Sequence, residues 1–206
     1  MDSLLWRLSG VALVASLLGL GACASTPSRF YILNTLPASE ATPATAAERG
    51  PVIGVGPITL PKYLDRPQIV TRASRNQLTL GEFDRWAESL QENFSSVLVE
   101  NLALLIPTDH ILLNSWPGSA TPEYQVRVEV RHFDGWLGGE STLIARWSIL
   151  DQGERELVSQ KVHLNAPAGG RDYEAMVVAM NQLLETLSRD IATAIQRLAS
   201  RAAARE

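Results

Sequence analysis

The sequence predicts a single α/β (or α+β) domain, in which two long amphipathic helices pack against a mixed β-sheet that contains a meander. Residues 82–105 and 172–198 repeat apolar side chains at steps of three and four, the period of a helix with one buried face. Between residues 124 and 164, three apolar segments are separated by turn residues, which indicates an antiparallel meander. The first two candidate strands have no hairpin partner beside them in the chain, so the sheet is expected to be mixed.

The first third of the chain predicts short strands and one long loop. Residues 29–33 and 52–58 predict two strands, and the proline near the end of the second segment is expected to end it. Residues 36–51 are rich in proline, alanine and threonine without periodicity, which predicts a flexible loop. Residues 68–71 and 77–80 flank a polar turn and predict a hairpin.

The first helix is expected over residues 82–105. Glu82 and Asp84 would lie in its first turn, where the positive end of the helix dipole favours acidic side chains, and Pro107 is expected to stop it. A short strand is expected to follow at residues 110–114. The apolar face of the helix would be formed by Phe83, Trp86, Leu90, Phe94, Val97, Leu98, Leu102 and Leu105.

The C-terminal part of the chain predicts the meander and the second helix. Strands are expected at residues 124–130, 142–150 and 157–164. The first of them alternates apolar and polar side chains, so one of its faces would be packed and the other wet. Asp172 is expected to cap the last helix, whose apolar stripe extends to about Leu198.

Length and composition fit one soluble domain over residues 30–200, followed by a frayed polar tail at residues 201–206. Hydrophobic residues make up 46% of the chain and charged residues 19%, which is ordinary for a soluble fold. The formal net charge is −4, so the chain lacks the basic field that nucleic-acid binding requires, and no nucleic-acid partner is expected.

The sequence offers no arrangement of residues that predicts catalysis or metal binding. His110, His132 and His163 lie far apart, without a cysteine or a close carboxylate pair at metal-ligand spacing. The last two are expected to be ordinary surface or rim residues on strands. No G-x-S-x-G nucleophile elbow occurs, and the run Gly54-Val55-Gly56 lacks the third glycine and the helix of a phosphate-binding fingerprint. We therefore expect no enzymatic activity and no bound metal or cofactor.

Four tryptophans fall within the expected domain and divide into two groups. Trp86 on the helix stripe and Trp147 on a strand face are expected in the core. Trp116 and Trp136 lie at turn or strand-end positions, where they are candidates for partner contacts, because tryptophan is enriched at binding hot spots.

The N-terminal segment predicts export and lipid attachment. Residues 1–22 are expected to be a signal peptide, because their apolar stretch is uncharged and too short to span a membrane. Cys23 is the only cysteine and closes the run Leu20-Gly21-Ala22-Cys23, which resembles the lipobox of bacterial lipoproteins, where the thiol is acylated. Residues 23–29 would then be a lipidated tether. Two other interpretations stay open: an ordinary secreted protein cut near this cysteine, and a short N-terminal membrane anchor.

Four segments carry a resemblance to a known family. They are residues 30–33 (FYIL), 58–72 (ITLPKYLDRPQIVTR), 82–90 (EFDRWAESL) and 99–102 (VENL). These segments are similar to segments of the paraquat-inducible protein C (PqiC) lipoproteins, also called ABC-type transport auxiliary lipoproteins. The resemblance covers nearly all of the mature chain and is strongest over residues 52–102.

The resemblance implies a non-catalytic lipoprotein, anchored in the outer membrane by a covalent lipid such as palmitate on Cys23 and facing the periplasm. Ala24 after the cysteine, where aspartate would retain an enterobacterial lipoprotein in the inner membrane, agrees with this location. The implied partner is a protein with mammalian-cell-entry (MCE) domains in an intermembrane lipid transport system, in some cases beside an ABC transporter, that supports membrane integrity. A ring-shaped partner would also suit a homo-oligomeric lipoprotein.

Within the shared motif, Tyr63, Leu64, Asp65 and Arg66 allow two interpretations: they either brace the loop before the next strand or form the docking surface for the partner. Three functions compete. The first is a docking subunit of a lipid conduit, the second a periplasmic lipid carrier with an apolar cavity, and the third an envelope hydrolase. The hydrolase lacks a nucleophile framework, and the carrier needs apolar helix faces that sheet packing already uses. We therefore favour the docking subunit.

Overall fold

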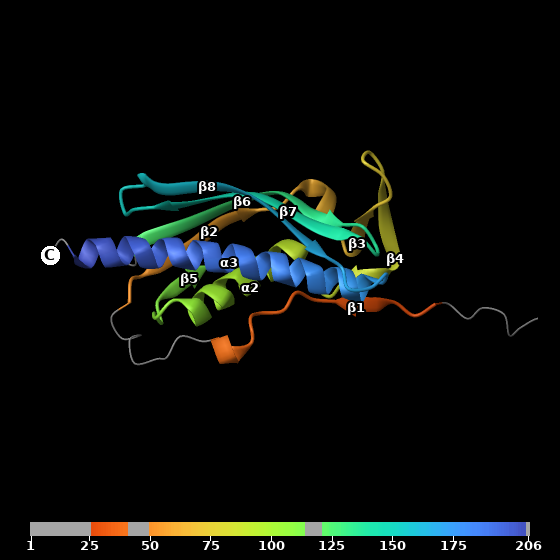
Figure 1. The fold of residues 1–206 in the computed structure, drawn as a ribbon, viewed down its shortest axis with the longest axis horizontal. Coiled ribbons are helices and arrows are strands. Elements are labelled where there is room, and N and C mark those ends of the chain that lie inside the picture. Colours follow the sequence, from red (N-terminus) through yellow and green to blue (C-terminus); the bar gives the residue numbers. More distant parts are fainter. Residues whose placement is uncertain (1–25, 41–49, 114–120, 205–206) are drawn as a thin grey trace, which may run out of the picture.

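The structure is a computed structural model that describes residues 26–40, 50–113 and 121–204 (Figure 1). Over these residues, an eight-stranded mixed sheet is packed by two α-helices, which confirms the expected fold class. The strands are β1 (Arg29–Tyr31), β2 (Ile53–Thr59), β3 (Gln68–Arg72), β4 (Leu78–Trp86), β5 (Ile111–Leu113), β6 (Tyr124–Gly135), β7 (Glu140–Leu150) and β8 (Glu156–Pro167). The helices are α2 (Leu90–Leu105) and α3 (Tyr173–Ala203), with the short 3-10 helices η2 (Ala38–Glu40) and η4 (Lys62–Leu64).

Strand β6 organises the sheet. Along one side it pairs with β7 in antiparallel register, and β7 pairs in the same way with β8, which confirms the predicted meander. On its other side β6 has two parallel neighbours, β2 at its beginning and β3 at its end, where Thr71 lies opposite Gly135. Strand β5 then adds to β2, and the antiparallel strand β4 adds to β3, with β1 at its outer edge.

Both helices lie on the same side of the sheet, as Figure 1 shows, and the core fills the space between the layers. The predicted inner face of β7 is buried, with Trp147 at 1% exposure. Trp86 is buried as well, so the expected core role of both tryptophans is confirmed. Each Å² of apolar surface removed from water stabilises the fold by about 25 cal/mol, so the burial of these side chains is the main contribution that holds the sheet and helices together. The largest fully buried side chains include Phe94, Phe133, Leu98, Leu102, Leu143, Ile149, Met176, Met180 and Leu184.

The start of the first helix differs from the prediction. Residues 82–86, including Phe83 and Trp86, belong to β4, and α2 begins only at Leu90 after the cap residue Ser89. Glu82 and Asp84 therefore do not lie in a helical first turn. The cause is tertiary pairing: β4 is held between β3 and β1, a strand 55 positions away in the chain, and this pairing overrides the local three- and four-residue spacing.

Pro57 does not end its strand, contrary to the prediction. Strand β2 continues to Thr59, and its register against β6 shifts between Val55 and Ile58. A bulge is a position where proline is tolerated inside a sheet, because the irregular residue has no ladder bond to lose. The side-chain amide of Gln125 donates to the carbonyl of Gly56 at 2.8 Å and so satisfies part of the displaced backbone.

The remaining elements follow the prediction closely. The hairpin of β3 and β4 forms, and the Asp172 carboxylate caps α3 by accepting from the amide of Ala175 at 2.8 Å. Helix α3 continues to Ala203, so the tail predicted to fray at residues 201–206 is helical in its first half. In the predicted loop of residues 36–51, Leu36 is buried and η2 follows it, while residues 41–49 lie outside the described residues. Over the described ranges, neither helix combines the length and apolarity needed to cross a membrane.

Candidate docking site

The motif that carried the family resemblance forms a tight turn between β2 and β3. Helix η4 is closed by backbone hydrogen bonds from the amide of Leu64 to the Pro61 carbonyl at 2.9 Å and from the amide of Asp65 to the Lys62 carbonyl at 3.1 Å. Leu64 is 3% exposed and belongs to the core, whereas Asp65 and Arg66 are exposed. A partner that approaches this turn therefore meets these two charged side chains and the exposed Lys62, and not the leucine.

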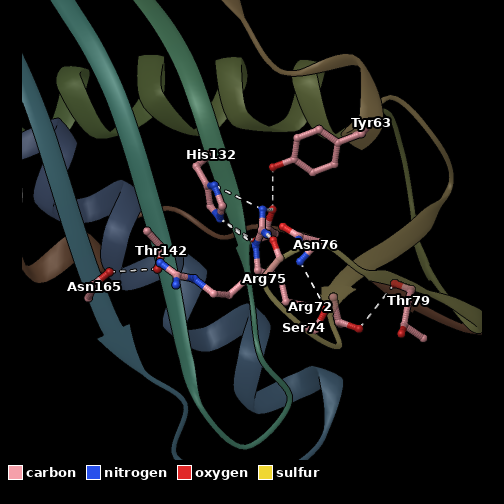
Figure 2. Close-up of polar contacts among 11 residues, drawn as sticks. Tyr63, Arg72, Ser74, Arg75, Asn76, Thr79, His132, Thr142 and Asn165 are labelled. Atoms are coloured by element: carbon pink, nitrogen blue, oxygen red, sulfur yellow. Dashed lines mark hydrogen bonds and ion pairs between the residues drawn. The ribbon is translucent and has the colours of Figure 1, made fainter.

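Tyr63 fastens the turn to the sheet through a buried carboxylate. Its phenol donates to Oδ2 of Asp134 on β6 at 2.5 Å, and the Asp134 side chain is fully buried. Arg72 at the end of β3 donates to both oxygens of the same carboxylate, at 2.7 and 3.3 Å. Nε2 of His132 lies 2.8 Å from Oδ1. Figure 2 shows Tyr63, Arg72 and His132 converging from three elements; we call Tyr63, Arg72, His132 and Asp134 the Asp134 cluster.

The cluster keeps Asp134 ionised in spite of its burial. Burial alone would raise the pKa of this carboxyl, but the hydrogen bonds from His132, Arg72 and Tyr63 outweigh it and hold the pKa below its usual range. Burial also raises the pKa of the Tyr63 phenol, and the hydrogen bond to Asp134 raises it further, so the phenol remains a donor. The buried Asp134 carboxylate is thus paired with a cation and contacted by three side chains. Because one of these, Tyr63, belongs to η4, the cluster fixes the position of this short helix.

The charged and polar groups of the cluster are bound to one another. Tyr63, Arg72 and His132 all contact the Asp134 carboxylate. Among the described residues, no group of three histidine, cysteine or acidic side chains is placed to hold a metal ion. His132 is half-buried on β6, which fits a rim residue, but the sequence did not reveal that its ring contacts both Arg72 and Asp134. His163, by contrast, is exposed on β8.

A shallow hollow of about 380 Å³ opens beside the exposed side of the turn. Asp65 and Arg66 form one side of it, and the segment that joins β4 to α2 forms the other. Trp86 and Leu90 contribute apolar surface to its wall. Charged side chains beside an apolar depression are the ordinary composition of a protein-binding surface.

The N-terminal segment is fastened to the same half of the molecule. Arg29 on β1 donates to both oxygens of Asp84 on β4, at 2.8 and 2.9 Å, and the phenol of Tyr31 donates to the same carboxylate at 2.8 Å. Burial together with this hydrogen bond raises the pKa of Tyr31 to about 12. Two buried asparagines of α2 continue the attachment: Oδ1 of Asn93 accepts from the amide of Leu33 at 2.7 Å, and Oδ1 of Asn101 accepts from the amide of Leu36 at 2.8 Å.

The other predicted site residues are placed differently. Trp136 lies in the turn between β6 and β7, two residues after Asp134, and is 39% exposed, as expected for a candidate contact residue. Trp116 and Cys23 lie outside the described residues. Sequence reasoning missed Asp134 as the partner of Tyr63 and Arg72. The only available signal was a charged residue within an apolar strand, and it does not say which distant residue it pairs with.

The comparison with known families gives the class of protein. Residues 31–192 match the family model of the ABC-type transport auxiliary lipoprotein component, and the chain belongs to this family. It is therefore an auxiliary lipoprotein of a transport system, a membrane-associated periplasmic protein.

Among individual proteins, the chain is similar to the intermembrane transport lipoprotein PqiC of Escherichia coli strain K12, with 25% identity over 157 residues, 76% of this chain and 81% of that protein. The PqiC of Shigella flexneri matches with the same figures. A crystal structure of a protein from Xanthomonas campestris shares the fold, with a TM-score of 0.67 at 14% identity over 84% of this chain and 99% of that one.

Proposed function

We propose that this lipoprotein is a non-catalytic docking subunit of an MCE-type intermembrane lipid transport system. Cys23 would carry the lipid that anchors it in the outer membrane, and the domain would face the periplasm and hold the end of the conduit there. The family match to transport auxiliary lipoproteins carries this proposal. Envelope integrity would depend on the protein through the lipid traffic of the conduit.

The docking surface would be the exposed side of the η4 turn, formed by Asp65 and Arg66 and the adjoining hollow. Support comes from the Asp134 cluster, which holds the turn in one conformation without using either of these side chains. A preformed surface binds with a smaller entropy cost than a mobile one. Trp136 follows the cluster directly in the chain and is a further candidate contact, as is Trp116.

The carrier function has less support than the docking function. A carrier would need the apolar faces of the helices to line a cavity. Instead, the stripe of α3 is buried in the core, with Leu184, Leu187, Ile191 and Ile195 at 0% exposure. An open hollow of about 530 Å³ near the C-terminus of α3 is lined partly by charged residues, among them Glu123, Asp151 and Arg155, which suits an acyl chain poorly.

Site-directed photo-crosslinking in cell envelopes tests the proposal. A crosslinking amino acid replaces Arg66, and a matched control replaces Lys161, which is exposed on β8 away from the turn. We expect a crosslink from position 66 to an MCE-domain protein, identified by mass spectrometry, and none from position 161. Recovery of lipid alone, at near one molecule per chain, would support the carrier function instead.

A homo-oligomer is the second part of the proposal. A ring-shaped conduit is matched best by a ring of identical docking subunits, because head-to-tail contacts that close generate rings. Light scattering of the purified protein at high concentration measures this directly. A strictly monomeric protein would contradict the ring.

A further inference from the structure

Exposed apolar side chains gather at one end of the domain. Nine large hydrophobic residues are exposed among the described residues, and six of them belong to β1, β4 and the turn between β6 and β7. We call these six the end patch: Phe30, Leu78, Leu80, Phe83, Trp136 and Leu137. Soluble domains usually scatter such side chains singly, and a group of them marks an interaction surface.

The sheet brings the members of the end patch together from three parts of the chain. Strand β3 links them, because it pairs with β4, where Arg72 lies opposite Leu78, and also with the end of β6, where Thr71 lies opposite Gly135. Strand β1 lies along β4, with Phe30 opposite Arg85. Figure 1 shows β4 running across the end of the domain at which β1 and the start of α3 also lie.

The orientation of Phe30 follows from its neighbours. Arg29 and Tyr31 both contact Asp84, so they point to one face of the β1–β4 pair. Because strand side chains alternate, Phe30 points to the opposite face, and it is 66% exposed. Tyr31 on the other face contacts Tyr173 of α3, with 6.3 Å between the ring centroids, so the face that carries Phe30 points away from this helix.

The predicted anchor reaches the same end of the domain. Cys23 precedes the first residue of β1 by six positions. Six residues span at most about 20 Å when fully extended, which is less than the thickness of a bilayer. The contacts of Arg29 and Tyr31 with Asp84 hold β1 on the domain, so only the six positions between Cys23 and β1 separate the anchor from the folded structure. An acylated Cys23 therefore keeps the end patch within a tether length of the lipid headgroups.

We propose that the end patch rests on the membrane, with Phe30, Phe83 and Trp136 in the headgroup region. Trp136 would then contact lipid and not the conduit partner, for which it is the other candidate contact. This inference rests on the proposed anchoring at Cys23. Aromatic side chains favour the membrane interface, because their rings are apolar and the tryptophan N–H finds polar partners there. The lipid on Cys23 supplies the anchor. Contact through the end patch then fixes the orientation of the domain, so that its long axis points away from the membrane.

The contact is apolar and not electrostatic. On the β3–β4 hairpin, the exposed charges nearest the patch are Arg75 and Glu82, one of each sign, and Arg29 is paired with Asp84. Binding through a basic patch would weaken as salt is added, because ions screen exposed charges beyond a Debye length of about 10 Å at 0.1 M. The end patch instead predicts contact that persists when salt is raised.

Quenching of tryptophan fluorescence tests this orientation. The mature lipidated protein is incorporated into phosphatidylcholine vesicles whose acyl chains carry bromine, a contact quencher. Trp86 and Trp147 are buried, so we expect Trp136 to supply much of the quenched emission. The variant Trp136→Phe should lose this component. In the matched control Trp136→Phe/Leu113→Trp, the reporter stands at a site of similar exposure, 36% against 39%, on β5 away from the end patch, and should not restore the quenching.

The outcomes separate this inference from the anchor itself. Protein that floats with the vesicles but shows equal quenching in the wild type and in Trp136→Phe overturns the membrane contact and leaves the anchor intact. Protein that does not float overturns both. Quenching that vanishes in high salt contradicts the apolar contact. If Trp136 is unquenched in vesicles and is shielded only when an MCE-domain protein is added, the end patch is a protein interface and the inference is wrong.

Discussion

Removal of one hydroxyl group tests whether the Asp134 cluster holds the docking turn. The variant Tyr63→Phe keeps the ring and deletes only the donor that lies 2.5 Å from Oδ2 of Asp134. The carboxylate keeps its contacts with Arg72 and His132, so the variant is expected to fold. A matched control is Tyr124→Phe, because the Tyr124 hydroxyl makes no hydrogen bond within the described part of the chain.

The expected cost follows from the burial of the acceptor. A hydrogen bond to a charged group contributes about 1.5–3 kcal/mol to the free energy of unfolding. The Asp134 side chain has no exposed surface through which water could replace the phenol. Three contacts from Arg72 and His132 remain, however, and share the charge. We therefore expect Tyr63→Phe to lower the free energy of unfolding by about 2 kcal/mol and the control by less than about 0.5 kcal/mol.

The pH dependence gives the prediction a second test. The pKa of Asp134 is lowered in the folded state, so the stabilisation by its donors is present above the unfolded pKa of about 3.9 and is lost as the pH falls through the lower folded value. Urea unfolding of both proteins should show the full difference near pH 7 and a smaller one in acid. A loss below about 0.5 kcal/mol at neutral pH, or a loss unchanged in acid, would refute the reasoning.

Two further predictions concern the N-terminal segment. Asn101→Ala should lower the free energy of unfolding by about 1–3 kcal/mol in urea unfolding, because it leaves the amide of Leu36 buried without an acceptor; an unchanged midpoint would contradict the role of this asparagine. Cys23→Ser should leave the unfolding transition unchanged but abolish acylation, so membrane fractionation should no longer recover the protein with the outer membrane. A variant still found there would contradict lipid anchoring at Cys23.

The sequence predicted elements whose partners lie nearby in the chain. The meander, the hairpin of β3 and β4, and the Asp172 cap of α3 depend on alternation, turn residues and one short-range hydrogen bond. Each is encoded within a few residues, so a local pattern is sufficient evidence. The Gly138 turn that joins β6 to β7 is of the same kind, since its φ of 73° favours glycine.

The errors fall where distant residues decide the structure. Phe83 and Trp86 continue the helical spacing of α2, yet β1 pairs with this segment from 55 positions away and makes it a strand. The docking turn was visible as a motif, but its attachment was not, because Tyr63 and Asp134 are 71 positions apart. Local periodicity carries no information on such pairs, so the exposed and buried members of the motif could not be separated from the sequence.

The attachments of the N-terminal segment have a mechanical consequence. If the anchor and the conduit pull in opposite directions, tension along the N-terminal segment reaches the ion pair of Arg29 and Asp84 first. It then meets the side-chain bonds that hold Leu33 and Leu36 to α2, one after another. A transient load would therefore be absorbed by detaching β1 and the few residues after it, which lengthens the link to the anchor, while the other seven strands and the η4 turn stay intact.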